Sequence, residues 1–149
     1  CGVPPIATRT GGVPELITLV KKTSGTDGRW EAICVLGDIG PSAQAAIPSL
    51  LPIASDVNDP NRTQAISTLG LIRSSPESVV PFLASCLRDS EEAVRYNAVI
   101  GLSWFGEAAH SSVSALRQSL TDPSEAVRNQ ATNTLKRIDP AAAAAAGIK

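Results

Sequence analysis

Apolar side chains recur along the chain at the spacing of an α-helix. One run has intervals of four, four and three residues: Val94, Ala98, Leu102 and Phe105. This spacing places them on one face of a helix, and a second apolar face begins at Val113 after the short turn "GEAAH". The same pattern predicts helices at about residues 28–39, 43–55, 60–73, 76–88, 91–105, 109–121 and 124–138.

The helix pairs belong to an internal repeat. Five series of positions keep an interval of 33 residues: Arg29, Arg62, Arg95 and Arg128; Ala32, Ala65, Ala98 and Ala131; Leu36, Leu69, Leu102 and Leu135; Ile39, Ile72, Phe105 and Ile138; Asp56, Asp89 and Asp122. One helix pair cannot bury its own apolar face, whereas stacked neighbours can. The sequence therefore predicts an all-α fold, an α-solenoid of antiparallel helix pairs.

The repeat also predicts how the chain is divided. Val13–Lys22 resembles the second helix of a unit, and Pro140 lies 99 residues after Pro41, so six alanines occupy the start of a further second helix. We expect a single repeat domain over residues 1–149, with these parts: an extended leader at 1–12, a half repeat at 13–27, full repeats at 28–59, 60–92 and 93–123, and a partial terminal repeat at 124–149.

Polar residues mark several predicted helix starts. Ser90 and Ser124 precede glutamates that suit the positive first turn of a helix, so both serines are expected to act as N-caps. Pro60 suits the first helical position, where the missing N–H of proline is not needed.

The repeated motif "VRxxAxxxLxxxG", followed by a helix rich in Val, Pro and Leu, resembles the short bacterial HEAT repeats, including those called bilin-lyase-like. The resemblance covers residues 28–138, and the signatures of tetratricopeptide and ankyrin repeats are absent. It implies that two charged series stack as a polar ladder between repeats: Asp56, Asp89 and Asp122 with Arg62, Arg95 and Arg128. Such repeats serve lyases, adaptors and scaffolds alike, so the resemblance indicates fold more than function.

Composition argues against several classes of partner. The formal charge is -1, from 13 basic and 14 acidic residues. Nucleic-acid binding usually requires a basic surface. The second helices, which are expected to form the concave face, offer Arg88 and Arg117 but little more. No run of 18 apolar residues is present, so a membrane contact would need a lipid anchor.

Candidate chemistry is sparse. His110 is the single histidine and stands in a slot that the preceding repeat fills with Glu77, which indicates a surface position. Cys34 and Cys86 lack metal or redox spacing, and no zinc or phosphate-binding motif is present. We therefore expect no catalytic residue, no metal and no cofactor, and predict that the chain is not an enzyme.

Cys1 is the candidate for lipid attachment. The sequence contains no methionine, and Cys1 followed by Gly2 looks like the start of a mature bacterial lipoprotein. The alternative is a truncation point. Lipidation would place the fold on the extracytoplasmic, periplasmic side of a membrane; without it the cytoplasm is expected.

Two surfaces are candidates for a protein partner. With Ala98 at the centre of the buried face, Tyr96, Ile100 and Trp104 fall at about 160°, 200° and 240° around the helix. Equivalent outward slots hold these residues: Trp30, Cys34 and Asp38; Thr63, Ser67 and Leu71; Asn129, Asn133 and Arg137. The row is either an interface or an aromatic cover over a neighbouring helix. The second helices present small side chains, with Phe82 as the bulky exception.

These observations favour a non-enzymatic binding or scaffold subunit that docks on a larger protein assembly, through Trp30, Tyr96, Ile100, Trp104 and Phe82. The alternative is an accessory or lyase-type subunit that handles a chromophore such as a bilin.

Overall fold

The computed structural model describes residues 12–22 and 28–148. Every regular element in these residues is helical, with α for α-helices and η for 3-10 helices: α1 (Val13–Lys21), α2 (Arg29–Ile39), η2 (Gly40–Ala46), α3 (Ile47–Ser55), α4 (Arg62–Ile72), α5 (Pro76–Cys86), α6 (Glu92–Phe105), η3 (Gly106–Ser112), α7 (Val113–Ser119), α8 (Glu125–Ile138) and α9 (Pro140–Ala145). The predicted all-α repeat fold is confirmed.

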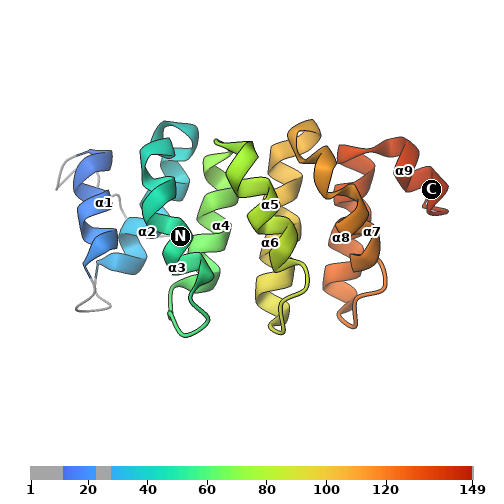
Figure 1. The fold of residues 1–149 in the computed structure, drawn as a ribbon, viewed down its shortest axis with the longest axis horizontal. Coiled ribbons are helices and arrows are strands. Elements are labelled where there is room, and N and C mark those ends of the chain that lie inside the picture. The colour runs from blue at the N-terminus through green and yellow to red at the C-terminus, as the bar shows by residue number, and fades with distance from the viewer. Residues whose placement is uncertain (1–11, 23–27, 149) are drawn as a thin grey trace. The chain divides into compact units, whose positions relative to one another are not determined.

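Contacts between Cα atoms divide the chain into two units, Cys1–Ser74 and Ser75–Lys149. In the first unit, α2 and α4 pack side by side, α1 packs against α2, and α3 packs against α4. In the second unit, α6 and α8 pack side by side, α5 packs against α6, and α7 and α9 pack against α8 (Figure 1). Each unit thus has a layer of first helices and a layer of second helices.

The predicted buried face forms the core of both units. The repeated alanines and leucines have no exposed surface: Ala32, Ala65, Ala98, Ala131, Leu36, Leu69, Leu102 and Leu135. Alanine allows two helices to approach closely, while leucine fills the space beside it. Burial of these apolar faces between layers is the main stabilising term of the fold.

A buried hydrogen bond joins the two first helices of each unit. Thr68 of α4 donates from Oγ1 to the carbonyl oxygen of Ile33 in α2, at 3.0 Å. Thr134 of α8 donates in the same way to Val99 in α6, at 3.5 Å. Thr68 and Thr134 are 66 residues apart, two repeats, and both side chains have no exposed surface. The two units therefore share the same polar contact inside an apolar layer.

The helix starts agree with the predictions in one case and correct them in two. The Ser124 side chain accepts a hydrogen bond from the Val127 N–H, as expected of an N-cap. The N-cap of α6 is Glu91, not Ser90, because Ser90 stands one residue earlier in the repeat than Ser124. Pro60 lies in a turn, and α4 begins two residues later at Arg62.

The turns inside the repeats take two forms. Gly40 and Gly106 have φ of 66° and 54° with ψ near -136° and -131°, a region open to glycine alone. In both repeats the chain continues as a 3-10 helix, so the predicted helices at 43–55 and 109–121 are each divided. In the middle repeat, Arg73 replaces the glycine at φ 49° and ψ 33°, and α5 begins directly at Pro76.

Candidate functional site

Three of the predicted partner-binding side chains form a row on α6. Tyr96, Ile100 and Trp104 lie on the side of the helix opposite Ala98, and each is half-buried. They therefore keep part of their apolar surface in water while the opposite face packs in the core. We call Tyr96, Ile100 and Trp104 the α6 row.

The equivalent row on α2 is different. Trp30, at the start of α2, is 41% exposed and so presents more of its ring to solvent than the half-buried Trp104. The prediction that Cys34 also points outward is wrong, because Cys34 is only 3% exposed. The helix α1 packs against α2, and burial raises the pKa of the Cys34 thiol above its ordinary value. On α2 the outward surface is therefore limited to Trp30 and the exposed Asp38.

The ladder implied by the resemblance is present in part. In the second unit Arg95 donates from Nε and Nη2 to the two carboxylate oxygens of Asp122, at 2.7 and 2.9 Å. In the first unit Arg29 binds Asp59 at 2.9 Å. Arg95 and Asp122 are 27 residues apart, and the same interval from Arg29 leads to Asp56, not to Asp59. Asp56 instead accepts a hydrogen bond from the backbone N–H of Asn58 within its own turn.

Hydrogen bonding stabilises the charged forms of Arg95 and Asp122. The pKa of Asp122 is lowered first by the hydrogen bond from Arg95, and further by the Ser124 N–H and by the nearby charge of Arg128. Burial opposes this shift but does not reverse it. The pKa of Arg95 is raised, chiefly by the same hydrogen bond. Arg128 donates to the carbonyl oxygens of Asp122 and Pro123, so the turn before α8 is bound from both sides.

The second helices carry a different surface. All the side chains predicted to point outward there are at least partly exposed: Ala45, Ser49, Pro52, Ser78, Phe82, Ser85, Ser111, Ala115 and Gln118. Phe82 of α5 is half-buried. Small side chains dominate this face, and a hollow opens on it in each unit.

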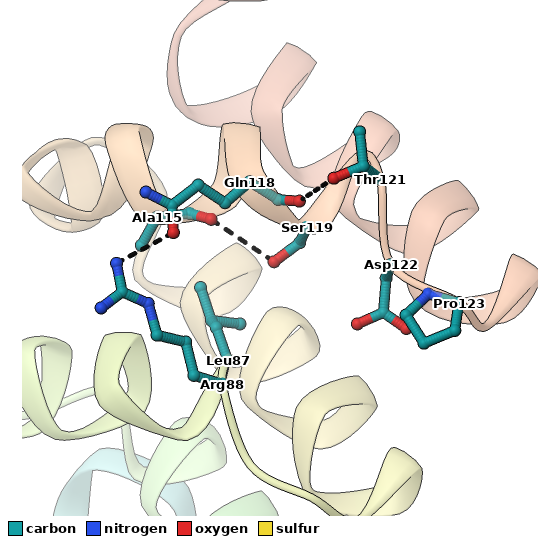
Figure 2. Close-up of a pocket in the computed structure, with 8 residues that line it drawn as sticks. All are labelled: Leu87, Arg88, Ala115, Gln118, Ser119, Thr121, Asp122 and Pro123. Carbon is teal, nitrogen blue, oxygen red and sulfur yellow. Dashed lines mark hydrogen bonds between the residues drawn. The ribbon is translucent and has the colours of Figure 1, made fainter.

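One hollow lies in the second unit between the end of α5, α7 and the turn before α8, as Figure 2 shows. We call it the Arg88 pocket; it has a volume of about 230 Å³ and is lined by Leu87, Arg88, Ala115, Gln118, Ser119, Thr121, Asp122 and Pro123. Across it, Arg88 donates from Nη2 to Oε1 of Gln118 at 2.9 Å. Both of these side chains are exposed.

A second hollow occupies the equivalent place in the first unit. We call it the Lys21 pocket; it has a volume of about 340 Å³ and is lined by Val20, Lys21, Arg29, Pro48, Ser49, Pro52 and Ile53. Four of these stand 66 residues before lining residues of the Arg88 pocket: Lys21, Ser49, Pro52 and Ile53 against Leu87, Ala115, Gln118 and Ser119. The hollow thus recurs with the repeat, which the sequence alone did not indicate.

His110, the other candidate for chemistry, lies at the surface. His110 has a side chain that is 69% exposed, and its Nδ1 lies 3.7 Å from Oδ2 of Asp139. Among the described residues no three His, Cys, Asp or Glu side chains are placed to hold a metal ion. Within the same residues, none of the helices has the length and hydrophobicity needed to cross a membrane. Cys1 lies outside the described residues, so its lipidation stays a prediction.

A family model for HEAT repeats matches residues 47–136. The chain belongs to the HEAT-repeat family. This assignment confirms the resemblance drawn from the repeated motif, and it indicates a protein-interaction scaffold in general terms. A search of curated protein sequences gives no significant match.

Solved structures support the same fold. An engineered protein from a structural genomics consortium is similar with a TM-score of 0.71 and 20% identity, over 91% of this chain and 68% of that one. The complex of CpcE and CpcF of phycocyanin lyase from Nostoc sp. PCC7120 is similar with a TM-score of 0.64 and 22% identity, over 87% of this chain and 79% of that one. At these identities the likeness concerns the fold alone.

Proposed function

We propose that this HEAT-repeat chain is a non-enzymatic binding subunit that docks on a larger protein assembly through its first-helix face. The observation that carries the proposal is the α6 row, which leaves Tyr96 and Trp104 partly in water. Aromatic side chains are the commonest energetic anchors of protein interfaces, because they bury a large area at low cost in side-chain entropy. Trp30, the exposed tryptophan of α2, offers the same chemistry on the first unit.

The neighbouring repeats support this proposal. The following repeat has Asn129 and Arg137 in the slots of Tyr96 and Trp104, and both are exposed. The fold therefore does not require an aromatic side chain at these places. Retaining two on one helix of a chain with 3% aromatic residues favours a role in contact with a partner.

The experiment exchanges the two aromatic residues of the α6 row for the residues of the next repeat, as Tyr96→Asn with Trp104→Arg. We expect the thermal midpoint to stay close to that of the wild type. Binding to a partner captured from extract of the source cells should weaken by about 2 kcal/mol or more, the usual scale for interface anchors. The matched control exchanges polar for polar in the same two slots of α8, as Asn129→Thr with Arg137→Gln. A variant that melts early but binds normally once folded would show that the row is part of the fold's own packing.

A second candidate function rests on the likeness to the phycocyanin lyase complex of CpcE and CpcF. In this case the chain would be an accessory or lyase-type subunit that handles a chromophore. Visible absorbance of the protein purified from its source, together with attachment of a bilin to an acceptor protein, distinguishes this candidate. A colourless protein with a stoichiometric protein partner and no such activity favours the scaffold.

A further inference from the structure

The Arg88 pocket combines an unpaired cation with an apolar floor. Within the described residues no carboxylate forms an ion pair with Arg88. Among these residues its side chain has one hydrogen bond, to Gln118. That bond uses one of the two N–H groups of Nη2. The other, paired with the N–H of Nε or of Nη1, leaves one forked edge of the guanidinium available. Leu87, Ala115 and Pro123 contribute apolar surface to the pocket, with Pro123 on the far side of it from the guanidinium (Figure 2).

The pocket also contains a carboxylate, but its charge is already balanced. Asp122 accepts two hydrogen bonds from Arg95 and one from the Ser124 N–H, and its side chain is 5% exposed. It therefore does not compete for Arg88. Its presence nevertheless makes the pocket less favourable for a doubly charged group such as a phosphate than for a single carboxylate, since like charges repel at short range.

We propose that the Arg88 pocket binds an aspartate or glutamate side chain of a partner polypeptide, with an apolar neighbour of that residue packed on Leu87, Ala115 and Pro123. An arginine fork binds a carboxylate through two parallel N–H···O bonds. The contact with Gln118 holds the guanidinium across the pocket before the partner arrives, which lowers the entropy lost on binding. The inference depends on the proposed protein-binding function but concerns a different face from the α6 row.

The first unit provides an independent instance of the same arrangement. In the Lys21 pocket an exposed lysine stands beside Val20, Pro52 and Ile53. Among the described residues Lys21 has no ion pair, whereas Arg29 in the same pocket is bound to Asp59. A cation next to an apolar floor thus occurs in both equivalent hollows, although different positions of the repeat supply the cation.

The test uses random peptides displayed on phage and selected on the whole purified chain. We expect the selected peptides to be enriched in an acidic residue next to an apolar one. Affinity should fall about tenfold to a hundredfold for Arg88→Gln, the range for losing a hydrogen-bonded charge. Arg88→Lys should recover only part of the affinity, because an ammonium group cannot form the fork. Arg88 is exposed, so these variants should fold normally, which a thermal melt checks.

The matched control is Arg117→Gln, which removes a cation of α7 that is also exposed but does not line the pocket. Selected peptides without acidic residues, or equal losses for Arg88→Gln and Arg117→Gln, would overturn the proposal. Peptides whose binding depends on Tyr96 and Trp104 but not on Arg88 would also overturn it, while leaving the proposed function in place. The reverse result would support the pocket and count against the α6 row.

Discussion

Replacing Asp122 by asparagine tests how much the arginine–aspartate contact stabilises the second unit. The carboxylate of Asp122 accepts from Arg95 Nε at 2.7 Å, from Arg95 Nη2 at 2.9 Å and from the Ser124 N–H at 2.8 Å. Asparagine has nearly the same shape but no charge, and its amide NH₂ would face a guanidinium that can only donate. We expect the free energy of unfolding at pH 7 to fall by about 2 kcal/mol, the scale of a hydrogen bond to a charged group.

The effect should depend on pH in one direction. The hydrogen bond from Arg95 holds the pKa of Asp122 below its ordinary value, so the folded chain releases this proton more readily than the unfolded chain. The stabilisation is therefore fully present above the unfolded pKa, about 3.9, and is lost as the pH falls through the lower folded pKa. The difference between wild type and Asp122→Asn should be constant near neutral pH and should shrink in acid.

Urea unfolding at a series of pH values measures both quantities. The control is Asp56→Asn, at the equivalent position two repeats earlier, where the exposed carboxylate accepts from the Asn58 N–H. Asparagine can accept the same bond, so this variant should lose only a few tenths of a kcal/mol. Equal losses for the two variants, or a loss from Asp122→Asn that persists unchanged in acid, would refute the argument from the Arg95 contact.

The fold could be predicted because the repeat has a constant length. An uninterrupted period of 33 residues brings each alanine and leucine of the series to the same place in every repeat, so one correctly assigned face determines all of them. Leu102 and its equivalents are accordingly all without exposed surface. Helix interiors follow such periodicity closely, since each side chain's direction is set by the 3.6-residue turn.

The errors occur where the local turn decides the geometry. The segment "DVNDPN" contains two aspartates that each accept from the N–H two residues later, at Asn58 and Asn61. These turns delay α4 until Arg62, so Pro60 is not helical. Asp59 also forms an ion pair with Arg29. The 33-residue period alone would predict Asp56 in this pair. Side-chain turns of this kind compete with helix starts and depend on more than spacing.

The candidate site could be predicted only in part. The α6 row lies on a single helix, so its shared face follows from spacing within one segment. The Arg88 pocket is formed by three segments, and its existence depends on how closely α5 and α7 approach. In the sequence, Arg88 is one of two basic residues on this face, which are too few for a nucleic-acid-binding surface. Ser49 and Ala115 are small side chains at equivalent positions two repeats apart and leave room for a hollow, but their size alone does not show how closely the helices approach.

Four further substitutions test the core packing and the turns, each by urea or thermal unfolding. Leu102→Ala removes a fully buried side chain and should cost about 2–5 kcal/mol; an unchanged midpoint would contradict the assigned core. Thr134→Val keeps the shape of the side chain but removes the hydroxyl that donates to the Val99 carbonyl oxygen, so it should cost about 1 kcal/mol, the value of that hydrogen bond. A gain in stability would show that the bond is not favourable. Gly106→Ala should cost about 1–3 kcal/mol, since φ of 54° with ψ of -131° suits glycine alone. Arg73 occupies the equivalent position with φ of 49° and ψ of 33°, which a side chain tolerates at a lower cost. Arg73→Gly should therefore be neutral or stabilise by up to about 1 kcal/mol, because relief of the left-handed strain is offset by the greater freedom of glycine in the unfolded chain. A loss of stability from Arg73→Gly as large as that from Gly106→Ala would mean that backbone strain does not distinguish the two kinds of turn.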